Sequence, residues 1–290
     1  MRRLSQLLVV GGLLVLSQAA SAGVVLTVQT KGAHPEAKPN TGTMSISGKK
    51  VRIEQPGPMG KNMVMVFRAD KNEMHQFDET NKIDQVVDQA SVKAMAQQLD
   101  QMEKMIEAQI QSAPPQQQKA MREMMAQQKK MREKPTAKTT VHPSSEKRTL
   151  LGKTCKRFDI KKDGKLVRTM YVAPKGSFAG EKEAMVGLEA ISTMMAQLTK
   201  DLPGSQQELP FGQLQKMGGV PLLIVEFNDD KEVARQTITA VTQQKLSAST
   251  FEAPAGFKRQ TLIESMQQMQ HRGAHGMGGA GMGAPVSRRR

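Results

Sequence analysis

Apolar and polar residues alternate along the early part of the chain, which is typical of strands that bury one face. The first such segment places Val24 and Leu26 on one side. A tight hairpin is predicted at Gly48-Lys49, because glycine suits the first central position of a type II′ turn. Centring the turn there pairs Ile46 with Val51.

The clearest turn in the sequence is Asp163-Gly164, a favoured type I′ pair. It joins two strand-like segments and predicts that Ile160 lies near Val167. Two further hairpins are predicted around residues 70–72 and 228–231, each between two apolar segments. The pattern therefore indicates an antiparallel sheet.

The spacing changes at Asp88, after which apolar residues recur every three or four positions along one helix face. Pro114-Pro115 ends this helix, and a second, Met-rich helical segment continues toward Pro135. The two segments predict a helical hairpin, inserted at about residues 88–134, with Gln, Lys and Met on its surface.

A third amphipathic helix is predicted from Glu181 to Lys200. Its apolar stripe needs a sheet to cover, so we expect the helix to lie across the sheet over an apolar pocket. The residues expected to line this pocket are Met185, Leu188, Ile191, Met195 and Leu198. Methionine side chains suit adaptable apolar surfaces, but they also fill irregular gaps in ordinary cores.

The N-terminus has the three zones of a secretory signal peptide: the cations Arg2 and Arg3, an apolar run, and small residues up to Ala22. We expect cleavage after Ala22, and a mature chain that works in the periplasm or outside the cell. The apolar run is shorter than the roughly 20 residues that span a bilayer, and no second run follows it. We therefore expect no transmembrane segment after cleavage.

One β-rich domain is predicted over residues 23–262, followed by a tail at 263–290 that is too polar and glycine-rich to order itself. Aromatic residues make up only 3% of the chain and tryptophan is absent, so the core must be aliphatic and Met-rich. The single cysteine, Cys155, cannot form an internal disulfide. Without a nearby histidine it is better explained as a packed strand residue than as a nucleophile.

The formal net charge of +15 is concentrated between Lys119 and Arg168. Outside the cytoplasm, such a face would meet anionic lipids, surface glycans or acidic proteins before nucleic acid. The alternative is a solvated surface that keeps the chain soluble.

Four segments resemble domain-of-unknown-function family 4412: residues 47–54, 152–158, 219–222 and 251–257. Members are secreted bacterial proteins, and their pattern is similar to that of periplasmic lipoprotein carriers of the LolA and LolB type. Over about Gly23 to Arg259, the resemblance implies an α+β fold with a curved antiparallel half-barrel sheet. It also implies a helix across the concave side, to which this chain adds the helical hairpin.

Signatures of common enzyme classes are missing, including phosphate-binding glycine loops, His-Glu-x-x-His and Gly-x-Ser-x-Gly. We therefore expect a non-catalytic protein without a cofactor. Three functions remain open. The first is a carrier that holds an apolar ligand, such as a lipid or acyl chain, between sheet and helix.

The second function is copper handling, because thioether sulfur is a soft ligand that suits Cu(I). Met102 and Met105, like Met121 and Met124, fall on one helix face. The strongest candidate ligands lie in the tail, where methionine has no core to fill: Met266, Met269, His271, His275, Met277 and Met282. The third function is a structural or interaction protein that holds an envelope partner through its basic face.

Overall fold

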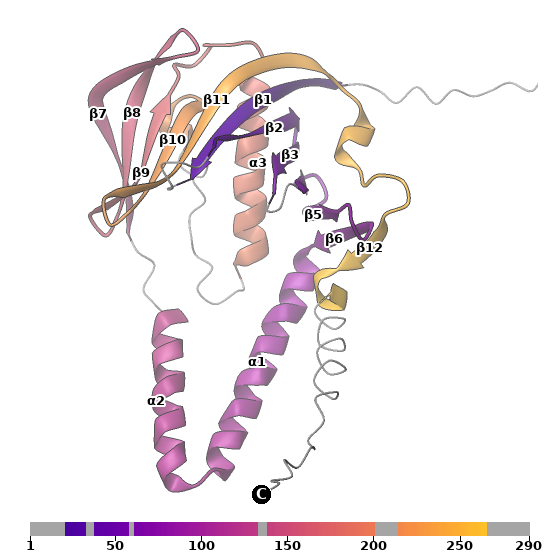
Figure 1. The fold of residues 1–290 in the computed structure, drawn as a ribbon, viewed down its shortest axis with the longest axis vertical. Coiled ribbons are helices and arrows are strands. Elements are labelled where there is room, and N and C mark those ends of the chain that lie inside the picture. Colours follow the sequence, from indigo (N-terminus) through magenta and orange to yellow (C-terminus); the bar gives the residue numbers. More distant parts are fainter. Residues whose placement is uncertain (1–20, 33–37, 58–60, 133–137, 201–213, 266–290) are drawn as a thin grey trace, which may run out of the picture.

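The computed structural model describes residues 21–32, 38–57, 61–132, 138–200 and 214–265. They form one twelve-stranded sheet with a few helices (Figure 1). The strands are β1 (Ser21–Gly32), β2 (Asn40–Ser47), β3 (Lys50–Pro56), β4 (Asn62–Arg68), β5 (Glu73–Asp78), β6 (Ile83–Val87), β7 (Thr139–Leu150), β8 (Lys153–Lys162), β9 (Lys165–Val172), β10 (Pro221–Asn228), β11 (Lys231–Leu246) and β12 (Lys258–Thr261). The helices are α1 (Gln89–Ser112), α2 (Pro115–Arg132), α3 (Glu181–Thr199) and α4 (Leu214–Met217), with a 3-10 turn η3 (Ala248–Phe251).

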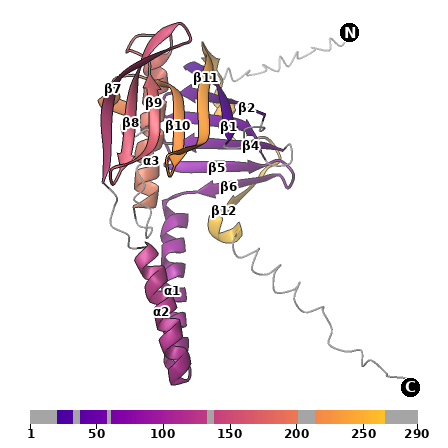
Figure 2. The ribbon, with the colours of Figure 1, turned by 60° about the vertical axis from the view of Figure 1, so that its left-hand side comes forward.

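The strand order is β12-β6-β5-β4-β3-β2-β1-β11-β10-β9-β8-β7. Every neighbouring pair is antiparallel except β12 and β6, which are parallel. The sheet is open and strongly curved, so that β7 to β10 and β4 to β6 run in clearly different directions (Figure 2). This architecture confirms an α+β fold built on a curved, mostly antiparallel sheet.

Local turn chemistry predicted the hairpins well. Ile46 pairs with Val51 across the turn at Gly48, whose φ is 56°. Asp163 and Gly164 both have positive φ, as a type I′ turn requires. Ile160 lies near Val167, as expected, and both belong to one apolar cluster. The register shifts beside Lys161, however, so the direct partner of Ile160 is Arg168. Val167 is therefore the extra residue of a β-bulge.

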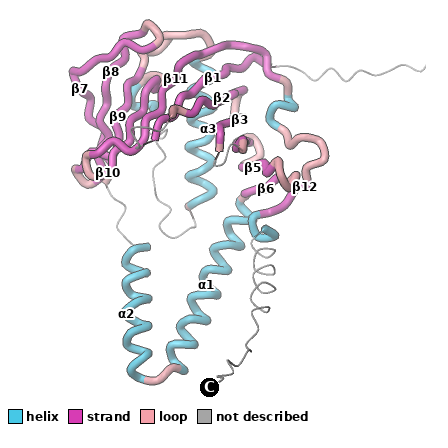
Figure 3. Tube along the Cα trace, in the orientation of Figure 1, coloured by secondary structure: helices cyan, strands magenta, loops and turns pink. Residues whose placement is uncertain are grey.

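Two helices, α1 and α2, lie where the helical hairpin was expected, and they contact each other. Asp88 caps α1, because its Oδ1 accepts a hydrogen bond of 2.8 Å from the backbone N–H of Ser91. The helix ends at Ser112, two residues before Pro114. From there α2 turns back, and the hairpin extends away from the sheet with its tip far from β1 (Figure 3).

Helix α3 packs on the face of the sheet that bears Val24, Leu26 and Ile46, which we call the inner face. Gly187 permits the close approach: a Cβ added there would lie 2.3 Å from Cγ2 of Ile46 and 3.1 Å from Cγ2 of Val51. Since real Cβ atoms do not approach other atoms so closely, only glycine fits this position without a shift of helix or sheet.

The opposite, outer face carries residues 247–261, which we call the C-terminal strap. Phe251 is buried there against Val64 and Val66 of β4. Arg68, almost fully buried, donates to Glu252 of the strap and binds Asp70 through two hydrogen bonds. The strap ends in β12, which pairs with β6 at the edge of the sheet.

The predicted terminal segments fall mostly outside the described residues. Residues 1–20 and 266–290 lie outside them, whereas Ser21 and Ala22 form the start of β1 opposite Leu246 and Lys245. Cleavage after Ala22 would thus leave the strand from Gly23 onward. No helix in the described ranges is long and apolar enough to cross a bilayer.

Cys155 lies on β8 and is completely buried among Tyr171, Leu222 and Leu223. Burial raises the pKa of its thiol, because the thiolate would lose its hydration. The side chain therefore serves as a packed strand residue, as the sequence indicated.

Candidate functional site

The five residues expected to line a pocket on α3 do not meet in one cavity. Leu188 packs in a core cluster with Met170 of β9, and Ile191 and Leu198 pack in another with Val24 of β1. Leu188, Ile191 and Leu198 are at most 4% exposed. The apolar stripe of α3 is therefore mainly core, and a ligand would have to displace close-packed side chains to reach it.

Met195 is half-buried and packs against the same cluster as Ile191. Met185, by contrast, lies at the edge of the packed region and lines an open groove beside the N-terminal half of α3. Of the five candidates, Met185 alone contributes to this groove.

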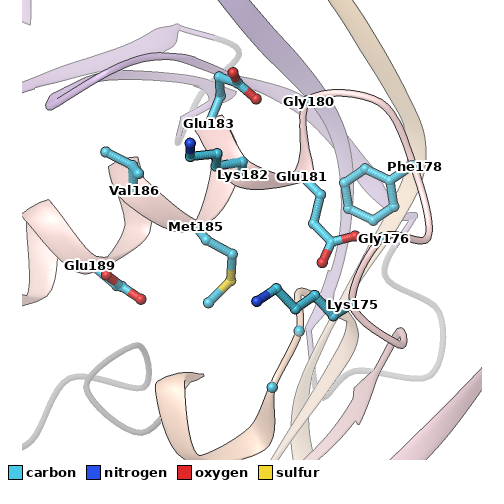
Figure 4. A pocket seen from close by; sticks show the side chains of 12 residues that line it. Lys175, Gly176, Phe178, Gly180, Glu181, Lys182, Glu183, Met185, Val186 and Glu189 are labelled. Carbon is cyan, nitrogen blue, oxygen red and sulfur yellow. The ribbon is translucent and has the colours of Figure 1, made fainter.

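The groove has a volume of about 640 Å³ and lies between α3, the loop before it, and the segment leading into β10 (Figure 4). This volume falls within the range of about 300–1,000 Å³ that small-molecule sites occupy. Its apolar lining consists of Phe178, Met185 and Val186. We call it the α3 groove.

Glycines keep the α3 groove open. Gly176 and Gly218 have φ values of 82° and 71°, which L side chains rarely adopt, and a Cβ at either would meet no atom within 4 Å. Gly219 packs closely against Ala173, which directly follows β9. A Cβ at position 219 would lie 2.0 Å from the carbonyl oxygen of Ala173. The turn geometry thus excludes side chains where they would fill the space.

Glu181 forms a fixed wall of the groove. The residue is only 7% exposed, and its Oε2 accepts a hydrogen bond of 2.7 Å from the backbone N–H of Ser177. The Ser177 hydroxyl in turn donates to the carbonyl of Pro174. These bonds hold the loop over the first turn of α3, and the carboxylate sits where a helix N-terminus favours negative charge.

Charged side chains of both signs surround the apolar lining. Lys175 and Lys182 are exposed, whereas Glu183 and Glu189 are half-buried. In Figure 4 the side chains of Lys175, Glu181 and Met185 converge on the open space. The groove therefore combines an apolar floor with cations that solvent can reach.

A second groove, of about 590 Å³, flanks the same part of α3 and shares Lys182, Glu183 and Val186 with the first. Its other wall is the turn between β2 and β3, including Lys49 and Lys50. Val186 separates the two grooves and is 39% exposed, an unusual exposure for a β-branched apolar residue in a helix that is otherwise packed. The N-terminal half of α3 thus presents a partly apolar surface on both flanks.

The sequence did not single out the loop residues of the α3 groove. Phe178 and Lys175 lie in a segment without helical or strand periodicity, so no pattern linked them to Met185. The available signal was the position of glycine residues. Those at 176, 180, 218 and 219 mark two turns that the fold brings together.

A buried polar network on β5 and β6 was also not expected. His75 Nδ1 lies 2.9 Å from Asp84 Oδ1, and His75 Nε2 lies 3.3 Å from Glu73 Oε2. Burial opposes ionisation of Glu73, but its hydrogen bonds and charge interactions with Arg259 of β12 and with His75 together lower its pKa. Because the carboxylates are shared among these partners, the network serves to attach β12 to the sheet.

The copper hypothesis is not tested by the described residues. The tail candidates, Met266 to Met282, lie outside them. Met102, Met105 and Met124 are exposed on the helical hairpin, and Met121 is partly buried there. Within the described ranges, no group of three or more His, Cys, Asp or Glu side chains could hold a metal ion.

Comparison with known proteins gives no family. No family profile matches the chain, so the resemblance to domain-of-unknown-function family 4412 is not confirmed. No curated protein matches the chain either. The chain is distantly similar to PNGF-II in its C2 crystals, with 12% identity and a TM-score of 0.39 over 87% of this chain and 34% of that chain. The P21 crystals of PNGF-II give 11% identity and a TM-score of 0.37 over 86% and 34%.

A LolA superfamily protein from Nitrosomonas europaea is similar with 7% identity and a TM-score of 0.29, over 81% of this chain and 91% of that chain. The present chain spans about a third of the PNGF-II chains. Similarities this distant support no inference about function.

Proposed function

We propose that this protein is a non-catalytic binding protein that holds the apolar chain of an amphiphile, such as a fatty acid or lipid, in the α3 groove. The observation that supports the proposal is an open groove of about 640 Å³, floored by Phe178, Met185 and Val186, beside a core that is otherwise filled. Unbranched methionine adapts to ligands of different shape, and phenylalanine supplies a large apolar contact.

The charges indicate how such a ligand would be oriented. Glu183 and Glu189 would repel an anionic head group, whereas the exposed Lys175 would attract it at the loop end of the groove. Glu181 accepts a hydrogen bond from the backbone N–H of Ser177, which fixes the position of its carboxylate. We therefore place the head group near Lys175 and the chain along Met185 and Val186.

Binding between helix and sheet, the site expected from the sequence, is not part of this proposal. Leu188, Ile191 and Leu198 make the close contacts of a core, and separating them would create a cavity that costs several kcal/mol. The α3 groove, by contrast, is open to solvent. A carrier of this kind would exchange its ligand at the end of α3 rather than beneath it.

The test is displacement of a fluorescent fatty acid from the chain lacking residues 1–22. Met185→Trp should fill the groove and abolish saturable binding, while Thr193→Trp, at an exposed position two turns further along α3, should leave it intact. Lys175→Glu should weaken binding of a fatty acid more than that of the corresponding alcohol. Absence of saturable binding by the unsubstituted protein would rule out the proposal.

The proposal includes export and a periplasmic or extracellular location. N-terminal sequencing of the protein made in its native host tests this, and Gly23 is the expected first residue. A chain that retains Met1 would contradict it.

A second candidate, an interaction protein of the envelope, is favoured by the basic edge of the sheet. Lys147 and Arg148 on β7, and Lys153 and Lys156 on β8, are exposed next to one another along the strand pair. Cosedimentation with anionic vesicles should detect such attachment, which should weaken as ionic strength rises. Attachment that is insensitive to salt would exclude this basic edge as its cause.

A further inference from the structure

The helical hairpin leaves apolar side chains uncovered. The described part of the chain has six large apolar residues that are exposed, and four of them lie on α1 and α2: Met102, Met105, Ile106 and Met124. Met105 is 66% exposed. Since methionine and isoleucine gain nothing from such exposure, a cluster of this kind marks a surface that another molecule covers.

Charge is confined to one side of α1. With about 100° of rotation per residue, Asp100, Glu103, Lys104 and Glu107 fall within an arc of roughly 100°. Met102, Met105 and Ile106 lie on the remaining surface, where glutamine and alanine are their neighbours. This side of the helix therefore has an apolar centre and no formal charge.

The same division holds for the first part of α2. Lys119, Arg122 and Glu123 lie on one arc and Met124 lies outside it. A cavity of about 270 Å³ between the two helices is lined by Glu103 and Arg122, among others, so the charged arcs adjoin the contact between the helices.

Each helix of the hairpin therefore has an uncharged side over its described side chains. The two helices are antiparallel. Residues that are rotated about each helix axis in the same direction from the contact between the helices therefore lie on the same side of the hairpin. Met124 of α2 thus falls on the same side of the helix pair as Met102 of α1. We call the surface that bears Met102, Met105, Ile106 and Met124 the uncharged face.

We propose that the uncharged face is a homodimer interface, at which the hairpins of two copies pack into a four-helix arrangement. In a chain of net charge +15, most surfaces of two copies would repel, whereas this face brings no like charges together. A two-fold dimer places the same patch on both sides, so the apolar centre of one copy covers that of the other.

The distribution of charge disfavours a membrane as the occupant. Helices that bind a bilayer surface flank their apolar side with lysine and arginine. Here Lys104 and Lys119 lie on the charged side of the hairpin, and glutamines border the uncharged face.

The size of the face suits a weak dimer. The part of α1 from Met95 to Ser112 is about 27 Å long, and two adjacent helices are roughly 20 Å wide, giving about 500 Å² per copy. The total of about 1,000 Å² is at the lower end for a specific interface. Association should therefore depend on concentration in the micromolar range.

Sedimentation velocity of the chain lacking residues 1–22 tests the proposal. The sedimentation coefficient should rise from the monomer toward the dimer value as concentration increases through the micromolar range. The double substitution M102E/M105E should abolish the rise, because it places like charges opposite one another in the interface. K104E, which changes the net charge by the same amount on the charged side, should retain it.

Cysteine crosslinking gives a second readout. Cys155 is fully buried, so a single cysteine introduced at 102 or 105 is the reactive thiol of the folded protein. Under mild oxidation Met102→Cys or Met105→Cys should yield a covalent dimer, and Lys104→Cys should not. Circular dichroism should show unchanged folding, since all three positions are exposed.

Three results would overturn the proposal: a monomer at every concentration, equal loss of dimer in K104E and M102E/M105E, or no crosslink from either methionine position. A monomer that instead binds phosphatidylglycerol vesicles through Met105 would assign the face to a lipid surface. The fatty-acid assay is independent, because Met185 lies on α3 and not on the hairpin.

Discussion

Methionine has opposite environments in two regions of this protein. In the sheet and α3, Met170 and Met194 are completely or almost completely buried, at 0% and 2% exposure. In the hairpin, Met102 and Met105 are 45% and 66% exposed. All four sit in regular elements at positions where apolar residues repeat. The difference shows that periodicity identifies a face of an element but not what covers that face.

The contrast extends to the polar groups. The sheet carries arginine and carboxylate pairs that attach distant segments, such as Arg68 with Asp70 and Glu252. In the described part of the hairpin, Ser91, Val92 and Ile110 are the buried residues of α1. The sheet and α3 therefore form a packed core, whereas the hairpin contributes few buried side chains.

The largest expected effect separates the two methionine environments directly. Met194→Ala should lower the free energy of unfolding by about 2–5 kcal/mol, because it leaves a cavity in a filled core. Met105→Ala, with the same change of side chain, should alter it by no more than about 0.5 kcal/mol in the monomer. Urea unfolding at low protein concentration measures both. Equal losses would show that the hairpin is as well packed as the core.

The next largest expected change in the free energy of unfolding concerns the contact between α3 and the sheet at Gly187. Gly187→Ala should destabilise the protein by about 1–3 kcal/mol, because the added methyl would overlap Ile46. Helix propensity alone favours alanine over glycine by about 1 kcal/mol. The substitution should therefore stabilise the protein if the contact is loose and destabilise it if the contact is tight. Ala108→Leu, which enlarges an exposed position of α1, is the control and should be neutral. Stabilisation by Gly187→Ala would contradict the close packing of α3.

Acid should weaken the sheet through its ion pairs. The hydrogen bond and charge of Arg68 lower the pKa of Asp70, and Arg259 and His75 together lower that of Glu73 against the effect of burial. The folded protein therefore binds fewer protons than the unfolded chain, whose carboxyl pKa values are about 4. This stabilisation is complete above that range and is lost as pH falls through the lower folded pKa values.

Unfolding midpoints measured between pH 7 and pH 2, in steps, would show the loss. Asp70→Asn should flatten the acid limb of the curve, whereas Asp100→Asn in the hairpin should leave a curve parallel to that of the unsubstituted protein. A curve unaffected by Asp70→Asn would show that the Arg68 pair contributes nothing to folding.

The smallest expected effect concerns the tail. Removing residues 266–290 should change the unfolding midpoint little, because their polar, glycine-rich sequence offers no apolar face. Cu(I) titration of the two chains tests the metal hypothesis at the same time. Equal affinity in both would exclude the tail as the site, and no affinity in either would end the copper hypothesis.

Much of the fold could be predicted because its hairpins are local. The turns at Gly48 and Asp163-Gly164 are specified by two residues each, and Asp88 specifies the start of α1. The bulge beside Ile160 was missed because nothing in a two-residue turn reports a register shift further along the strands. The parallel pairing of β12 with β6 joins segments about 170 residues apart, and no local pattern encodes such a contact.

The candidate site was predicted less well, for a related reason. The stripe on α3 correctly indicated a buried face, but core packing and ligand binding need the same apolar spacing. The groove depends on two glycine-containing loops whose proximity arises only when β9 and β10 pair. Met185 belongs both to the stripe and to the groove, whereas Phe178 lies in a loop that no periodic pattern marks.

The central position of β1 affects the order in which the sheet can be built. Its partners are β2, which follows it directly, and β11, which is made more than 200 residues later. Strands β2 to β6 and strands β7 to β9 can each form as local meanders, but the two halves join only when β11 pairs with β1. Such distant pairing must overcome the entropy of closing a long loop, which slows folding. Pairing of β11 with β1 therefore joins the two halves of the sheet, and a chain in which it has not formed leaves the β1 edge open to wrong partners.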